Sequence, residues 1–347
     1  MSGAREAGRP QPGPGPQASP SGRGSERPNP LSGAAIRTVD LYKTYVSPRG
    51  DVPAVRGVDL EVPPGEFFGL LGPNGAGKST TIGMLTTLVV PTAGRAEVSG
   101  LDVVRHPVEV KRRIGMVSQN NTLDQELTAA ENLEFRGRFF GMRGRDARRR
   151  ADELLEMFTL TDRRKATPYE LSGGQAKRLM ICRALVHRPE VLFLDEPTAG
   201  LDPQTRVNLW EVLRGLQAEG QTILLTTHYM EEAEALCERV AVIDHGRVLA
   251  CDTVDGLKGS AGADTVVTVT YEGRVPDSVG VLADRPGISR VEVADGQVRV
   301  FAREADGLLR ELVNAGAAAD VAVTDAAQQR PSLETVFLTL TGREYRE

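Results

Sequence analysis

One short segment constrains the fold of this chain more than any other: GPNGAGKS, at Gly72–Ser79. The apolar run EFFGLLG at residues 66–72 leads into it and is typical of a buried strand, while KSTTIGMLTTL at 78–88 predicts a helix directly after it. A strand, a glycine-rich loop and a helix in this order form a phosphate-binding loop (P-loop), because the glycines let backbone N–H groups close around phosphates. We expect Lys78 to reach the β- and γ-phosphates of a nucleotide and Ser79 to hold Mg²⁺.

Strands and helices alternate beyond this loop. PQTRVNLWEVLRGLQ (203–217) predicts a helix, and buried strands are indicated at RIGMVSQ (113–119), VLFLDE (191–196) and TILLTTH (222–228). This alternation predicts a P-loop α/β cassette with a mainly parallel sheet. Two segments before the loop, IRTVDLYKTY and AVRGVDLEV, predict an antiparallel β flank. The largely helical stretch at about 120–172 predicts a helical insert hung on the sheet.

Composition and pattern divide the chain into three parts. Residues 1–34 consist mainly of Gly, Pro, Ser and Arg, which bury too little apolar surface to fold, so we expect a disordered tail. Residues 35–258 form the α/β domain. Residues 264–347 follow a β-α-β-β-α-β order, which predicts a ferredoxin-like α+β accessory domain. The segment SLETVFLTLTG near its end predicts a helix whose apolar face covers either its own sheet or another subunit.

Two acidic residues, Asp195 and Glu196, end the predicted strand VLFLDE. Adjacent carboxylates are costly at such a place unless a cation lies nearby, and Mg²⁺ beside the P-loop supplies one. Gln119 and His228 also end predicted strands, and ligands of open α/β sheets collect at the carboxyl ends of strands. The expected metal ligands are therefore Ser79, Gln119 and Asp195, and the expected catalytic residues are Lys78, Gln119, His228 and, as general base, Glu196.

A second phosphate cradle is indicated in ELSGGQAKRLMICRAL (170–185), where Ser172-Gly173-Gly174 directly precedes a predicted helix. The open backbone N–H groups and the positive dipole end of such a helix suit an anion. Two other candidates have both a functional and a structural interpretation. Tyr45 either stacks on adenine or packs against the rest of the fold. Asp202 binds the nucleotide, caps the helix that begins at Pro203, or does both. The expected nucleotide contacts are Tyr45, Gly72, Pro73, Asn74, Gly75, Ala76, Gly77, Lys78, Ser79, Thr80, Ser172, Gly173, Gly174, Gln175 and Asp202.

Bulk properties narrow the class of partner. The formal net charge of -5 argues against a nucleic-acid-binding surface. No run approaches the ~18 apolar residues that a membrane span requires, so work at a membrane needs another polypeptide to do the spanning. The three cysteines, Cys182, Cys237 and Cys251, lack metal-site or redox spacing, which favours reduced thiols in a cytosolic protein.

From Tyr45 to about Lys258, these motifs resemble the ATP-binding cassette ATPases. The P-loop, Gln119, LSGGQ, VLFLDEP, GLD and His228 occur in the order of that family. The resemblance implies that two cassettes pack head to tail around two ATP molecules. The P-loop of one cassette and the Ser172–Gly174 helix end of the other would then enclose each γ-phosphate. The simplest partner is a second copy of this chain in a two-fold homodimer.

Further segments resemble the daunorubicin-resistance type of drug-exporter ATPase, namely TTHYMEEAE (226–234), GLDP (200–203) and PSLETVFLTLTGRE (331–344). That resemblance implies a separate integral membrane permease of about six helices, a hydrophobic drug, antibiotic or lipid as cargo, and a position at the cytoplasmic face of the cell membrane. The helical insert follows Gln119, so we expect it to carry the permease contact. Two alternatives stay open: a non-transport cassette ATPase of translation or DNA repair, and an importer ATPase.

Overall fold

The structure is a computed structural model that describes residues 33–48, 50–260, 265–294, 296–302, 305–329 and 332–341. The tail expected at residues 1–34 lies outside the described residues, except for its last two positions. None of the described helices combines the length with the apolar character that a membrane span requires.

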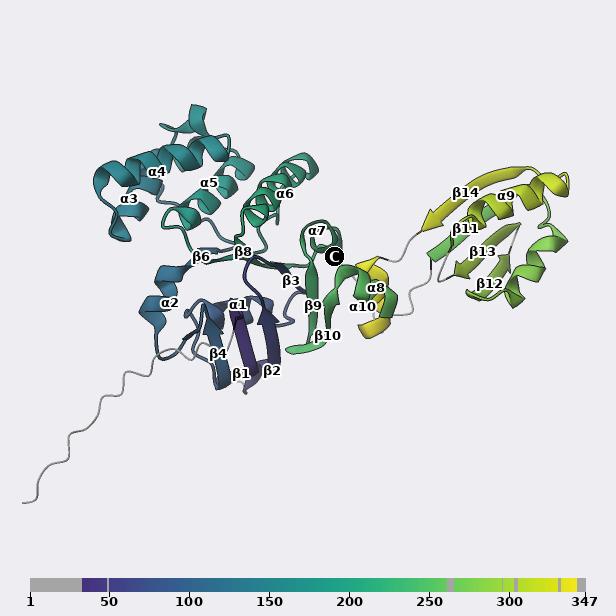
Figure 1. Ribbon diagram of the computed structural model, residues 1–347, viewed down its shortest axis with the longest axis horizontal. Coiled ribbons are helices and arrows are strands. Elements are labelled where there is room, and N and C mark those ends of the chain that lie inside the picture. Colours follow the sequence, from purple (N-terminus) through teal and green to yellow (C-terminus); the bar gives the residue numbers. More distant parts are fainter. Residues whose placement is uncertain are drawn as a thin grey trace, which may run out of the picture.

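A six-stranded sheet forms the centre of the cassette, in the order β10-β9-β3-β8-β7-β6 (Figure 1). The β9–β10 pair is antiparallel and the other described pairs are parallel, so the predicted, mainly parallel sheet is confirmed. The strands are β3 (Phe67–Leu71), β6 (Ile114–Val117), β7 (Val191–Asp195), β8 (Thr222–Thr227), β9 (Arg239–Asp244) and β10 (Arg247–Thr253).

Both faces of this sheet are covered, which explains the continuous apolar runs in its strands. Every residue of β3 and β7 is buried. Because successive side chains of a strand point to opposite faces, Phe67 and Leu71 pack into one core while Phe68 and Leu70 pack into a second core. Two cores therefore hold the carboxyl ends of these strands in fixed positions.

The predicted antiparallel flank is a four-stranded sheet in the order β2-β1-β4-β5. Helix α1 (Lys78–Leu85) packs in the same core as this flank and the central sheet, through Ile82, Met84 and Leu85. The strands are β1 (Ile36–Tyr45), β2 (Val52–Val62), β4 (Ala93–Val98) and β5 (Leu101–Asp102), and α2 (Pro107–Arg113) precedes β6.

The helical insert contains α3 (Ala129–Phe139) and α4 (Gly144–Met157), and α5 (Gly173–Leu185), which follows the insert, lies beside them on one side of the central sheet in Figure 1. Short 3₁₀ turns, η1 (Thr161–Arg163) and η2 (Pro168–Glu170), join α4 to α5. Ala151, Leu154 and Leu155 follow helical spacing along α4 and are buried in the core shared with the sheet. The other helices of the cassette are α6 (Pro203–Ala218), α7 (Met230–Leu236) and α8 (Val254–Ser260).

The C-terminal elements form a four-stranded antiparallel sheet in the order β12-β13-β11-β14, as a ferredoxin-like unit requires. Its core is separate from those of the cassette and includes Val267, Val269 and Leu312. The first predicted helix of this unit is a 3₁₀ helix, η3 (Asp277–Asp284), and the second is α9 (Leu308–Ala318). The strands are β11 (Thr265–Tyr271), β12 (Ile288–Ala294), β13 (Gln297–Ala302) and β14 (Val323–Gln329).

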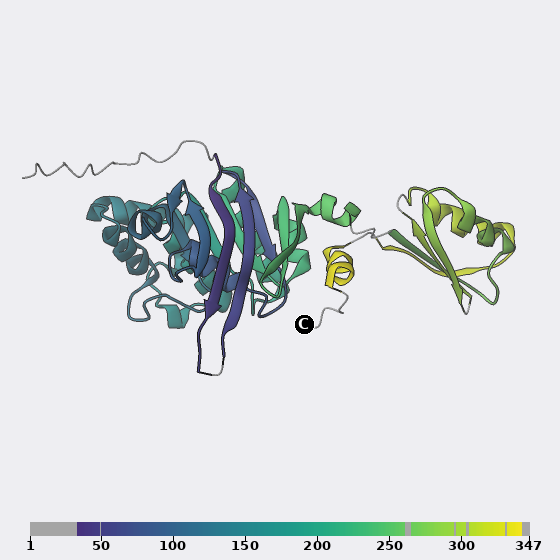
Figure 2. The same ribbon diagram turned by 90° about the horizontal axis from the view of Figure 1, so that it is seen from below.

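The last helix, α10 (Leu333–Thr341), packs where neither sequence-based alternative placed it. Its buried Leu333, Val336 and Phe337 belong to the core of the cassette, and α10 lies beside α8 and away from the C-terminal sheet in Figures 1 and 2. The backbone N–H of Leu333 donates to Glu234 Oε1 at 2.6 Å, and Lys258 Nζ lies 2.7 Å from the other oxygen of the same carboxylate. The apolar face of α10 therefore covers the cassette of its own chain.

Candidate active site

The P-loop connects β3 to α1 with a backbone that glycine alone fits at two positions. A Cβ at Gly72 would lie 2.1 Å from the carbonyl oxygen of Ile243, so a side chain there would collide with β9. Gly77 has φ +107, and a Cβ there would lie 2.5 Å from the carbonyl oxygen of Ala54. No described side chain caps the start of α1, which leaves its first backbone N–H groups available to an anion.

Lys78 folds back over this loop and is 4% exposed. Its Nζ donates to the carbonyl oxygens of Gly72 at 2.7 Å and Pro73 at 3.2 Å, and it lies 3.4 Å from Glu196 Oε1. Burial lowers the pKa of Lys78 below the usual lysine value, and the charge of Glu196 opposes that shift. The P-loop thus holds a buried cation next to a carboxylate.

The acidic pair at the end of β7 lies directly beside the P-loop. Asp195 Oδ1 accepts hydrogen bonds from Ser79 Oγ at 3.1 Å and from Thr226 Oγ1 at 2.6 Å. Glu196 has φ +47, an uncommon value for a residue with a side chain, and its N–H donates to the carbonyl oxygen of Thr226 at 3.1 Å. The end of β8 therefore holds both acids in place through its backbone and a threonine hydroxyl.

Two more strand ends deliver polar side chains to Glu196. Gln119 Nε2 donates to Glu196 Oε2 at 3.4 Å, and His228 Nδ1 lies 3.3 Å from Glu196 Oε1. Together with Lys78, three side chains from different parts of the chain surround one carboxylate. These groups open into a cavity of about 570 Å³, which is lined by Tyr45, Val52, Ala54, Asn74, Gly75, Gly77, Lys78, Ser79, Thr80, Gln119, Glu196, Ala199 and His228.

The second cradle is not part of this cavity. None of its described lining residues comes from Ser172–Gln175. Ser172 instead caps α5, since its Oγ accepts from the N–H of Gln175 at 3.2 Å and its own N–H donates to Gln175 Oε1 at 3.0 Å. Ser172 and Gly173 are exposed, so this helix start is open to solvent and lies outside the cavity beside the P-loop of its own chain.

Asp202 takes the capping role that the sequence left open. Its Oδ1 accepts from the N–H of Thr205 at 3.0 Å at the start of α6. Hydrogen bonds from Thr205 hold the pKa of Asp202 below its usual value. Asp202 does not line the cavity that holds Glu196, so in this chain its described contacts are those of a helix cap.

Sequence reasoning missed Thr226, Val52, Ala54 and Ala199. Thr226 is fully buried, and its hydroxyl is the shortest described contact of Asp195. Its signal was the pair of threonines that follows the apolar residues ILL in TILLTT, since a buried hydroxyl needs a partner. Val52 and Ala54 reach the cavity because the flank folds over the P-loop, a contact that carries no local sequence signal.

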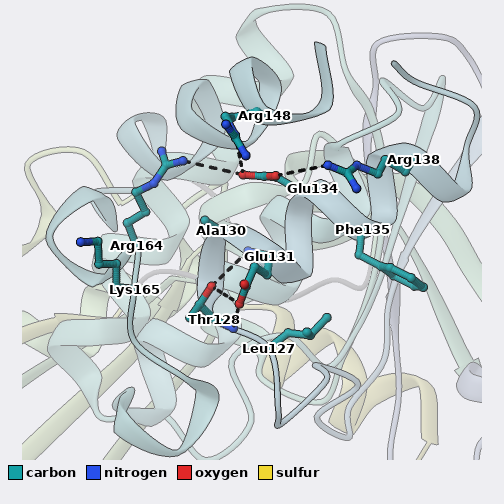
Figure 3. A pocket seen from close by; sticks show the side chains of 10 residues that line it. All are labelled: Leu127, Thr128, Ala130, Glu131, Glu134, Phe135, Arg138, Arg148, Arg164 and Lys165. Carbon is teal, nitrogen blue, oxygen red and sulfur yellow. Dashed lines mark hydrogen bonds and ion pairs between the residues drawn. The ribbon is translucent and has the colours of Figure 1, made fainter. Parts of the chain in front are cut away.

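Two hollows involve the helical insert, one on its own surface and one between the insert and the elements before it. The first, of about 520 Å³, surrounds Glu134, whose carboxylate meets Arg148 at 3.3 Å, Arg164 at 3.7 Å and Arg138 at 4.0 Å (Figure 3). Figure 3 also shows Leu127 and Phe135 beside the Thr128–Glu131 cap of α3. The second hollow, of about 780 Å³, is more apolar and is lined by Thr86, Leu88, Val108, Lys111, Arg112, Ile114, Met116, Arg136, Phe139, Phe140 and Gly141.

Comparison with known proteins gives consistent matches. Residues 55–199 match the family model described as ABC transporter. The chain is 45% identical over 315 residues to the daunorubicin resistance ATP-binding protein DrrA2 of Streptomyces coeruleorubidus, which covers 90% of this chain and 96% of that protein. It is 41% identical to the Nod factor export ATP-binding protein I of Rhizobium sp. (strain N33), over 90% of this chain and 99% of that protein.

Solved structures match the cassette part of the chain. A dimeric post-hydrolysis state of an ATP-binding cassette bound to ADP and Pi aligns with a TM-score of 0.59 and 31% identity, and it covers 63% of this chain and 98% of that one. A structure described as the ATP-binding subunit of an ABC transporter also aligns with a TM-score of 0.59 and 31% identity, over 66% of this chain and 93% of that one.

Proposed function

The chain belongs to the ABC transporter family, and we propose that it is the ATP-hydrolysing subunit of an exporter with a separate membrane permease. The names of its relatives refer to resistance and export, which favours export over a role in translation, repair or import. One observation carries the catalytic part of the proposal: Lys78, Gln119 and His228 all meet the carboxylate of Glu196 beside the P-loop.

Glu196 acts as the general base of hydrolysis. Its carboxylate accepts the proton of the water that attacks the γ-phosphate, while Gln119 and His228 hold the carboxylate in position. Lys78 Nζ donates hydrogen bonds to the carbonyl oxygens of Gly72 and Pro73. When ATP binds, Lys78 exchanges these neutral acceptors for the negatively charged phosphate oxygens. The backbone N–H groups at the start of α1 bind the same phosphates.

The residues beside the P-loop also fit Mg²⁺. Ser79, Gln119 and Asp195 supply hydroxyl, amide and carboxylate oxygens, which are the hard donors that Mg²⁺ prefers, and Ser79 and Asp195 already lie within 3.1 Å of one another. Mg²⁺ usually takes one or two carboxylates together with substrate phosphates, so the single carboxylate of Asp195 suffices. When bound, the ion neutralises negative charge on the phosphates.

A second cassette completes the site. The helix start with its exposed Ser172 and Gly173 lies outside the cavity of its own chain, so it is accessible to the γ-phosphate held by a partner. One chain carries one P-loop and one such helix start, and a two-fold dimer pairs both of them at two sites. We propose a homodimer for this arrangement.

The permease docks on the helical insert at the cytoplasmic face of the membrane. Phe139 is 72% exposed at the edge of the 780 Å³ hollow, and Phe135 is 62% exposed at the edge of the 520 Å³ hollow. Large apolar side chains that gather around a recess favour contact with another protein. The expected permease of about six helices would insert a short segment between α2 and α3, where Lys111 and Arg112 add positive charge.

Replacing Glu196 by Gln tests the catalytic assignment. The amide has nearly the same shape but does not accept a proton, so steady-state phosphate release should fall by ~10²–10⁴-fold while ATP binding persists. The variant should also accumulate as an ATP-bound dimer, visible by light scattering. Glu190→Gln is the matched control, because Glu190 is an exposed carboxylate just before β7. Turnover of Glu196→Gln near that of the control would refute the role of Glu196.

A further inference from the structure

A buried lysine outside the expected site connects α5 to the main chain that follows β6. Lys177 lies on α5, which begins at the Ser172 cradle, and it is 7% exposed. Its Nζ donates to the carbonyl oxygens of Ser118 at 3.3 Å and Gln119 at 3.4 Å. These partners lie 59 and 58 positions earlier in the chain, at the exit of β6 toward the insert.

Lys177 is a charged residue in a buried position, which is unusual for a side chain that only fills space in the core. Burial lowers the pKa of Lys177, while the charges of Asp195, Glu232 and Glu196 oppose that shift. Burying an ammonium is unfavourable unless it is hydrogen-bonded and balanced by negative charge. In the described structure its hydrogen bonds go to backbone carbonyls rather than to these carboxylates, so what the lysine holds in place is a segment of main chain.

That segment of main chain includes Gln119, whose side chain contacts the proposed general base. The side chain of Gln119 donates to Glu196 Oε2 at 3.4 Å, so a shift of the Gln119 backbone moves a group that contacts the proposed base. The other end of the link is α5, which carries Ser172 and Gly173 at its exposed start. A helix is rigid over such a distance, and a movement of Gln119 is therefore transmitted to the cradle.

We propose that Lys177 is a positioning residue that couples Gln119 in the nucleotide site of its own chain to the Ser172–Gly174 cradle that the chain presents to its partner. This inference rests on the proposed ATPase function and on the two-subunit site. It assigns Lys177 two effects: it keeps Gln119 beside Glu196, and it makes each site sensitive to the nucleotide in the other.

The experiment is a double-mutant cycle in the full-length chain with Lys177→Met and Gln119→Ala. Lys177→Met should leave the ATP affinity of the dilute subunit within about twofold, and it should lower kcat about tenfold, the size of one lost hydrogen bond from a charged donor. The double variant should be no slower than Gln119→Ala alone, because Lys177 acts through Gln119. The Hill coefficient for ATP should fall toward one in Lys177→Met.

Arg178→Met is the matched control. Arg178 is the next residue of α5, but its guanidinium donates to the carbonyl oxygen of Phe158 at 3.1 Å and to Thr159 Oγ1 at 3.3 Å, within the insert. Its kcat should stay within about twofold of the wild type. Lys177→Gln, which keeps a polar donor, accompanies Lys177→Met in case the apolar variant disturbs folding.

Three results would overturn the inference. Rate losses that multiply in the double variant would show that Lys177 acts independently of Gln119. An unchanged kcat and Hill coefficient in Lys177→Met would show that the contact between Lys177 and the Gln119 backbone has no effect on catalysis or cooperativity. If both Lys177 variants lose activity only in step with the loss of folded protein, measured by thermal unfolding, the lysine is purely structural. A wild-type chain without ATPase activity would instead refute the proposed function, and this inference with it.

Discussion

The packing of α10 leads to a quantitative prediction for Phe337→Ala. Phe337 is 3% exposed and packs in the core of the cassette, together with Leu333 and Val336. Truncating a buried phenylalanine to alanine destabilises a protein by about 3–5 kcal/mol, because apolar burial is lost and a cavity remains. In a domain of this size, 1 kcal/mol shifts Tm by about 2–4 °C, so the cassette should melt roughly 6–20 °C lower.

Differential scanning calorimetry of the full chain measures this shift. Leu340→Ala is the matched control, because Leu340 lies on the same helix but is 38% exposed, and we expect it to change stability by no more than about 0.5 kcal/mol. A Tm of Phe337→Ala within 2 °C of the control, with no new protease cleavage near α10, would refute the packing of this helix against α7 and α8. A loss confined to the unfolding of the C-terminal sheet would refute it as well.

Further predictions concern the nucleotide site, the permease and acid stability. Lys78→Ala should weaken ATP binding by the dilute subunit, whereas Ser172→Arg should leave it intact and block dimer closure; fluorescence titration separates the two, and lost binding in Ser172→Arg would contradict a site completed by a partner. Phe139→Glu should abolish transport in cells while the isolated subunit keeps its ATPase activity, and equal loss of both would contradict a role of Phe139 in the permease contact. Burial lowers the pKa of His187 from 6.5 to about 4, while its bond to the carbonyl oxygen of Ile114 opposes the shift. Since the unfolded chain takes up the proton first, this group should lower the stability by about 1.5 kcal/mol between pH 6.5 and pH 5. In denaturant titrations, His187→Gln should therefore lose less stability over that interval than the wild type.

Local patterns in the sequence predicted most of the residues that line the candidate active site. The glycine-rich loop, the acids after β7, and the polar residues that follow β6 and β8 are short-range features, and a parallel sheet necessarily gathers the carboxyl ends of its strands at one edge. The contacts of Lys78, Gln119 and His228 with Glu196 follow from that geometry. Their roles in hydrolysis stay a proposal that the Glu196→Gln experiment tests.

Element boundaries and helix type were less accessible to sequence patterns. The helix expected at 78–88 ends at Leu85, because Thr87 adopts a left-handed φ of +64 and Pro91 follows soon after. The β-α-β-β-α-β order placed a helix at PDSVGVLADRPG (276–287), and the structure has a 3₁₀ helix at Asp277–Asp284. A 3₁₀ helix is the tighter relative of the α-helix and occurs in short pieces, and this segment has only eight residues.

The sequence by itself determined which segments form strands, where the phosphate-binding backbone lies and which side chains reach the end of the sheet, because each of these depends on residues that are neighbours in the chain. The tertiary structure alone decided where α10 packs, which hydroxyl donates to Asp195 and which backbone carbonyls accept hydrogen bonds from Lys177. Leu333 and Glu234 are 99 positions apart, and Lys177 and Gln119 are 58 positions apart. No local pattern links such pairs, since their meeting depends on the path of the whole chain and on which apolar faces remain to be covered once the sheet has formed.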